Sequence, residues 1–215
     1  MKKMKLGNTF LIILITVIFI IGYAFFIKTS YFHRLSSWVE TNRLSFIVYL
    51  LVWKIVATVW PPLTGGLVTL GSIPLIGWEA AYFVDFSGSL IAGVIDYHLG
   101  RKYGLWILNK LFDESVVRKI QKVKVKENKE IETVFLYRLF LGMSLLEGVY
   151  YSAGFLRITF RNFLIGAALS HIAIGVPTFY FIRSVFDTKN IIFTVVLLVI
   201  GIPIIYLLRK RHFEF

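Results

Sequence analysis

Residues 55–78, IVATVWPPLTGGLVTLGSIPLIGW, decide the fold, because they are apolar enough to enter a membrane and too broken to cross it as one helix. The stretch is uncharged over 24 residues, yet three prolines and four glycines interrupt it. Proline removes a helical hydrogen bond, and glycine weakens a helix interior. Broken backbone at membrane depth persists only where protein or trapped water satisfies its polar groups. We therefore predict that residues 44–78 form a re-entrant hairpin that bends near 61–66.

A second re-entrant hairpin is predicted at residues 133–156. Arg138 and Glu147 lie within this stretch, and three glycines divide it. The uncharged pieces between these residues are each only about half as long as the roughly 20 residues that a spanning helix needs.

Four other stretches are long and apolar enough to span a bilayer, namely 6–27, 80–100, 162–182 and 190–208. The second of them carries Asp85 and Asp96. Ionisable groups at such depth normally face the protein interior or a watery cavity, so both are candidate site residues. The predicted fold class is an all-α membrane protein with about four transmembrane helices and two oppositely oriented re-entrant helical hairpins. A hairpin followed by a helix occurs twice, once from each side of the membrane, as expected of an inverted repeat.

Composition supports a membrane protein. Hydrophobic residues make up 57% of the 215 residues and charged residues 17%, and the mean hydropathy is +0.74, whereas soluble domains carry about 25% charged residues. The formal charge of +12 fits cytoplasmic loops that face anionic headgroups and does not require a nucleic acid partner. Because the chain has no cysteine, disulfides, thiolate nucleophiles and cysteine-based metal sites are excluded.

Positive charge predicts the orientation in the membrane. Residues 101–132 hold nine Lys or Arg against five Asp or Glu, and further basic clusters precede residue 6 and follow residue 208. Positively charged loops are retained in the cytoplasm, so both termini are expected there, in a multi-pass protein of the plasma membrane. The run 6–27 exceeds the 7–15 apolar residues of a signal peptide and predicts an uncleaved anchor.

The chain is expected to divide into three parts. These are an anchor helix with an external loop over 1–43, a core with both hairpins over 44–183, and a final helix with a basic cytoplasmic tail over 184–215.

The segment 113–132 is predicted to be a surface-lying amphipathic helix, the alternative being a solvated connector. Its apolar positions share one helical face and are Val116, Val117, Ile120 and Val123. Close packing between helices is predicted where small residues recur four apart, at Ser89 and Gly93, at Gly100 and Gly104, and at Gly166 and Ser170. The last pair is expected to meet the helix 80–100.

Several motifs, taken in order, resemble the DedA/SNARE-associated (VTT-domain) superfamily. They are PPLTGGLVTLGSIPLIG from Pro61, YHLGRKYG from Tyr97, FLYRLF around Arg138, AGFLR from Ala153 and FRNF from Phe160. The resemblance covers about 55–183. It implies two facing re-entrant hairpins and movement of lipids between leaflets: phospholipid scrambling in some members and polyprenyl-phosphate transport in others, often coupled to protons.

Carried over residue by residue, the resemblance implies that Arg138 and Arg101 contact a lipid headgroup. A guanidinium offers a planar fork of donors that suits phosphate oxygens. The alternative is an ion pair that only holds the fold together. Gly65 and Gly66 are expected to leave room for the headgroup.

The sequence also departs from the family pattern. DedA members proper usually carry an acidic residue after a Pro-Gly pair in the first hairpin and a proline and second arginine in the second hairpin. This chain has Thr64-Gly65 and Leu141 to Ser144 at these places. We hypothesise that Glu147 supplies the hairpin carboxylate. Glu147 and Asp96 are candidate proton-coupling groups, or they pair with Arg138 or Lys54.

These observations predict a lipid translocator that is not an enzyme and uses no cofactor or metal. The chain has no P-loop, GxSxG or HExxH motif. Its four histidines, His171 among them, lack metal-ligand spacing and are assigned to packing or an interface. The expected partners are anionic phospholipid or polyprenyl phosphate, with a homo-oligomer left open. The alternative is a structural or assembly protein that docks a partner, and a membrane-bound phosphatase is disfavoured because no activated nucleophile is visible.

Overall fold

The computed structural model describes residues 22–186, apart from residues 24, 61, 62, 64, 124 and 127 and the side chains of 140–147, 185 and 186. Over these residues the chain is helical and contains no strand, which confirms the predicted all-α class. The predicted helix 190–208 and most of the predicted helix 6–27 lie outside the described residues. The chain forms two compact units, Met1–Arg43 and Leu44–Phe215.

The described part of the first unit contains helix α2 (Ser30–Thr41). Thr29 begins this helix, because its hydroxyl oxygen accepts a hydrogen bond of 3.3 Å from the Phe32 amide. A side-chain oxygen at this position satisfies one of the free amides of a first helical turn. Phe32 and Val39, which are two turns apart, form the buried face.

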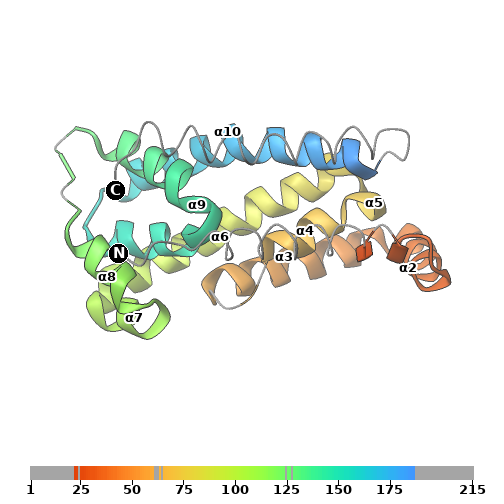
Figure 1. Ribbon diagram of the computed structural model, residues 1–215, viewed down its shortest axis with the longest axis horizontal. Helices are drawn as coiled ribbons and strands as arrows, with labels where there is room; N and C mark the ends of the chain where they lie inside the picture. Colours follow the sequence, from red (N-terminus) through yellow and green to blue (C-terminus); the bar gives the residue numbers. More distant parts are fainter. Residues whose placement is uncertain are drawn as a thin grey trace, which may run out of the picture. The chain divides into compact units, whose positions relative to one another are not determined.

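The region 44–78 contains three helices, α3 (Arg43–Val59), α4 (Gly65–Gly71) and α5 (Ile73–Ile76). The break between α3 and α4 falls where the sequence predicted a bend. The chain reverses there, since a Cβ built on Gly65 would lie 3.0 Å from Ala57 Cβ. Figure 1 accordingly shows α4 beside α3.

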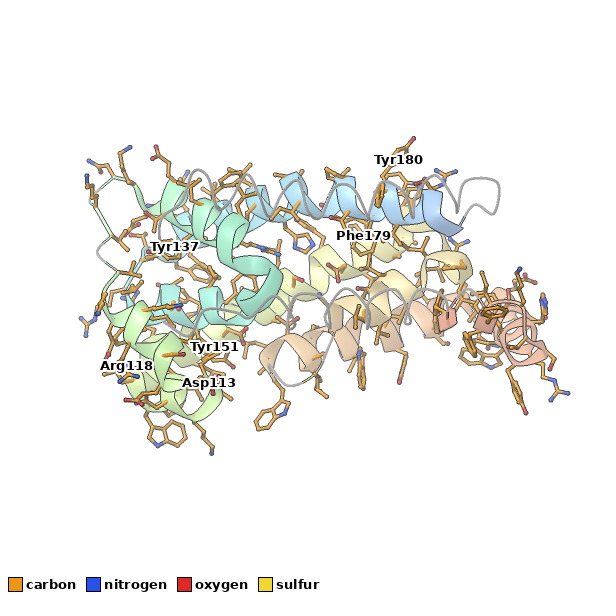
Figure 2. All side chains as sticks on the ribbon, in the orientation of Figure 1. Asp113, Arg118, Tyr137, Tyr151, Phe179 and Tyr180 are labelled. Atoms are coloured by element: carbon orange, nitrogen blue, oxygen red, sulfur yellow. The ribbon has the colours of Figure 1, made fainter. Side chains whose placement is uncertain are left out.

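Two long helices lie where two spans were predicted, and only the second of them is apolar enough to be a span by itself. They are α6 (Trp78–Tyr103), for 80–100, and α10 (Phe160–Phe186), for 162–182. Within the described residues, α10 alone is long and apolar enough to cross a membrane by itself, while α2 and α3 reach this standard only when counted together. In Figure 2, Tyr180 of α10 points away from the bundle and Phe179 points into it. Their exposed fractions are 61% and 3%.

The second predicted hairpin is helix α9 (Glu130–Phe155), which has no non-helical interruption but doubles back. A straight helix of this length would span roughly 39 Å. However, the Glu130 carboxylate accepts a hydrogen bond of 3.1 Å from the amide of Thr159, only four residues beyond Phe155. Four extended residues cover at most about 14 Å, so the two ends of α9 must lie close together. Figure 1 shows the turn, with both arms of α9 at the same end of the unit.

Glycines allow α6 to touch the second arm of α9 at backbone distance. A Cβ on Gly100 would lie 2.1 Å from Tyr151 O, and a Cβ on Gly154 would lie 2.0 Å from Tyr97 O. The prediction of close packing at Gly100 is therefore confirmed. The prediction for Gly166 is wrong about the partner, because this glycine faces Ile131 O and Val134 on the first arm of α9, each 2.8 Å from its built Cβ.

The segment after α6 folds into two short helices, α7 (Leu105–Leu111) and α8 (Glu114–Gln121). The apolar face of α8 was predicted to lie on the membrane surface. Instead, Val117 and Ile120 are buried against Leu108 of α7 and Tyr151 of α9. Figure 2 shows Tyr151 beside this pair of helices. The amphipathic pattern was therefore real, but it reflects packing against protein.

Candidate functional site

A lysine buried in α3 is the starting point of the site. Lys54 is 3% exposed, and its ammonium lies 2.7 Å from Asp85 Oδ1 of α6. The side chain reaches this position between two glycines, because a built Cβ would lie 3.2 Å from Lys54 Cδ at Gly65 and 2.6 Å from Lys54 Cγ at Gly88. Gly65 therefore makes room for this lysine, whereas the position of Gly66 is open, with nothing within 4 Å of its built Cβ.

Asp85 joins two further elements at this point. Thr69 of α4 donates a hydrogen bond of 2.6 Å to Oδ1. His171 Nε2 of α10 lies 3.2 Å from Oδ2. A buried carboxylate is tolerated when it is paired and hydrogen-bonded in this way, and Asp85 thereby holds α3, α4, α6 and α10 together.

Arg138, on the first arm of α9, completes the group. Its guanidinium donates to Tyr150 Oη on the second arm, to His171 Nδ1 and, at 2.9 Å, to Ala167 O. The guanidinium carbon also lies 5.1 Å from the centre of the Tyr150 ring, a cation–π distance. The contact between Arg138 and Tyr150 links the two arms of α9, since twelve residues of straight helix would separate them by roughly 18 Å.

These side chains form a continuous chain of polar contacts that we call the interior network. It consists of Lys54, Thr69, Asp85, Arg138, Tyr150 and His171. An arginine can only donate, so Nδ1 of His171 accepts from Arg138. The proton of a neutral ring is then on Nε2, facing Asp85. His171 thus connects the carboxylate to the guanidinium.

The described interior network holds two cations and one carboxylate, and with a neutral His171 its formal charge is +1. All of its charged groups are buried, with Arg138 3% and Asp85 6% exposed. Ionisable groups buried in a membrane protein are costly and tend to be functional. Lys54 and Arg138 are both cations, and an anionic group is their natural ligand.

Among the other predicted site residues, Asp96 is fully buried in α6, eleven residues or roughly 16 Å along the helix from Asp85. Arg101 lies at the end of α6, where its NH1 donates a hydrogen bond of 2.7 Å to Tyr97 Oη. The side chain of Glu147 lies outside the described residues. Lys54 therefore pairs with Asp85, whereas the sequence had suggested Asp96 or Glu147.

The sequence reasoning missed His171 and Thr69 and left Asp85 without a role. A histidine in a helix is usually a packing residue when no second metal-ligating side chain lies one turn away from it. Its position in the membrane could have revealed its role. His171 lies near the middle of the apolar stretch 162–182, where an ionisable side chain needs a partner.

A comparison with family models matches residues 62–184 to the VTT domain. Comparisons with curated proteins and with solved structures gave no match. The match covers more than half of the chain and includes α4, α6, α9 and α10, which carry every member of the interior network except Lys54. The chain is therefore a membrane protein that belongs to the VTT-domain family, the DedA/SNARE-associated family.

Proposed function

We propose that this protein moves lipids with a phosphate-bearing headgroup between the two leaflets of the membrane. The observation that carries the proposal is the burial of two cations in the interior network, Lys54 and Arg138, which come from two different hairpin segments. A phosphate suits this place, because a guanidinium and an ammonium both donate to its oxygens. The acyl tails would remain in the bilayer.

In the proposed arrangement, residues 44–78 and 133–156 are re-entrant hairpins in a multi-pass protein of the plasma membrane, with both termini in the cytoplasm. Tyr151 supports this pairing of hairpins, since its hydroxyl donates a hydrogen bond of 2.8 Å to Val59 O at the end of α3. That bond satisfies a backbone carbonyl next to the break, as broken backbone at membrane depth requires.

The headgroup would travel by exchanging partners. A phosphate oxygen takes the place of Ala167 O or the Tyr150 hydroxyl at Arg138, and another takes the place of Asp85 at Lys54. Each exchange keeps Lys54 and Arg138 bound to an acceptor, and the displaced Asp85 keeps Thr69 and His171 as neighbours. Such a pathway needs no covalent chemistry. A scramblase needs no energy source, while directed transport requires coupling to protons, for which the carboxylates Asp85, Asp96 and Glu147 are candidates.

A second function has one observation in its favour. Within the described interior, both cations already have protein partners, as they would in a structural protein whose hairpins dock another membrane protein. In that case the interior network only holds the helices together, and removal of Arg138 would change stability without changing lipid movement.

The test is leaflet exchange in proteoliposomes containing the full chain and trace fluorescent phosphatidylcholine, measured by dithionite quenching. Arg138→Gln should slow exchange at least tenfold, because it removes the charge and keeps hydrogen-bonding capacity. The matched control is Arg118→Gln, an exposed arginine of α8 that pairs with Glu114. Unchanged exchange by a folded Arg138→Gln protein contradicts the transport role and favours docking.

The same vesicles identify the lipid and the coupling. A labelled polyprenyl phosphate is compared with phosphatidylcholine, each with and without a pH gradient across the vesicle membrane. Acceleration by the gradient indicates proton coupling, whereas equal rates in both directions indicate scrambling.

A further inference from the structure

A surface pocket of about 530 Å³ lies where the end of α6 meets the start of α10. It is separate from the interior network. Its lining residues are Tyr97, His98, Arg101, Arg157, Thr159 and Phe160. Two arginines thus line one pocket together with aromatic residues, and neither arginine forms an ion pair with a described acidic side chain.

Arg157 occupies a backbone conformation that normally belongs to glycine. Its φ is +56°, and it follows the last turn of α9. The amide of Arg157 bonds to Gly154 O and the amide of Ile158 to Ala153 O, each at 3.1 Å, which is the Schellman pattern of helix termination. Glycine is favoured at this position because a Cβ is strained there. An arginine held in a strained conformation suggests a use for its side chain.

Arg101 is held in place by a short chain of hydrogen bonds. Its NH1 donates to Tyr97 Oη, and the Tyr97 hydroxyl donates a bond of 2.6 Å to Ile158 O, next to Arg157. One of the five N–H groups of the guanidinium is used in this way, so donors remain for a ligand. The same bonds connect the end of α6 to the turn that carries Arg157.

We propose that this pocket binds a phosphate group at the membrane surface, as a second anion site that does not depend on the transport function. Two guanidinium forks suit the three or more oxygens of a phosphate, whereas a carboxylate with two oxygens is satisfied by one fork. The phosphate is that of a lipid headgroup or a free phosphate. The Phe160 ring, which is exposed, provides an apolar contact for the rest of a headgroup.

The test is calorimetric titration of the full chain in neutral detergent with two probes, inorganic phosphate and dihexanoyl phosphatidic acid. Arg101→Gln and Arg157→Gln should each weaken binding at least tenfold, and Arg118→Gln should leave it unchanged. The decisive variant is Arg157→Gly, which relieves the backbone strain. It should raise the melting temperature and still lose binding, so the loss cannot be attributed to unfolding.

The outcomes separate the two sources of phosphate and the two sites. Binding of the lipid probe alone assigns the pocket to a headgroup, and equal binding of both probes assigns it to the phosphate group itself. A binding event that Arg138→Gln removes and Arg157→Gly retains belongs to the interior network and not to this pocket. The proposal is overturned if neither probe binds or if Arg157→Gly binds like the unchanged protein.

Discussion

At the scale of single residues, the interior network shows how a membrane protein can keep charge away from lipid. Asp85 is the only described member with a negative charge, and it contacts Lys54, Thr69 and His171 at once. Removing one member of such a pair leaves the other buried without compensation, while removing both leaves no unpaired charge. This asymmetry gives a direct test of the pairing.

Lys54→Met should lower the free energy of unfolding by about 3 to 5 kcal/mol, because Asp85 then lacks its cation. Met keeps most of the apolar stem between the glycines. Adding Asp85→Asn should restore a substantial part of the loss, measured by denaturant unfolding in mixed micelles. Additive losses in the double variant would show that the two side chains are not coupled.

Sequence reasoning found Arg138 and Lys54 because a charged residue inside an apolar stretch can be recognised from the sequence alone. It did not find their partners. Asp85, Thr69 and His171 are far apart along the chain, and their meeting depends on how α4, α6 and α10 pack. Contacts of this kind are set by tertiary geometry and leave no spacing pattern in a single sequence.

At the scale of elements, the packing of α6 against α9 depends on glycines that have no side chain to move aside. The prediction of Gly-rich crossings succeeded for Gly100, since small residues four apart favour close approach. It failed for Gly166, because composition says that a helix can approach closely but not which helix it meets.

Gly100→Ala should destabilise the protein, by about 1 to 3 kcal/mol or more, because the new Cβ would overlap Tyr151 O. The control is Gly66→Ala, where nothing lies within 4 Å of the built Cβ and the better helix propensity of alanine should be neutral or slightly favourable. Melting temperatures in detergent measure both. Equal melting temperatures for the two variants would contradict the backbone contact.

Glu130 ties the start of α9 to the start of α10 and gives this contact a pH dependence. Partial burial acts to raise the Glu130 pKa, but hydrogen bonds from the Asn162 side chain and from Thr159 outweigh it and lower the pKa. A lowered folded pKa means that the stabilisation is complete above the ordinary glutamate pKa of roughly 4.3 and is lost as the pH falls through the folded value.

Glu130→Gln should therefore lower the melting temperature at pH 7, and its difference from the unchanged protein should shrink as the pH falls below about 4. The comparison variant is Glu132→Gln, whose exposed carboxylate pairs only with Lys129 among the described contacts. A difference that stays constant from pH 7 to pH 3 would show that Glu130 is not ionised in this contact.

At the scale of the whole molecule, the absence of cysteine from the sequence makes the proposed topology easy to test. Single cysteines can be introduced at Ser37 in α2 and at Ser115 in α8, both of which are exposed. With the termini in the cytoplasm, a membrane-impermeant maleimide added to intact cells should label Ser37→Cys. It should label Ser115→Cys only after the cells are opened. The reverse pattern would invert the proposed orientation.

The long helices and the break at 60–64 could be predicted because hydropathy, proline and glycine act locally. The turn in α9 was predicted from its charges and glycines, yet no residue of α9 leaves the helical state, so the bend is absorbed without a loop. The role of α8 was predicted incorrectly. A face made of Val117 and Ile120 fits lipid and protein equally well, and only the position of Tyr151 decides between them.

The passage of the Lys54 stem between Gly65 and Gly88 has a consequence for how the interior responds to a ligand. The two glycines confine the methylenes of Lys54, so its ammonium has little room to move. An anion that bound Lys54 would therefore displace the Asp85 carboxylate and change its contacts with Thr69 and His171. Because His171 also contacts Arg138, binding at one cation would alter the surroundings of the other.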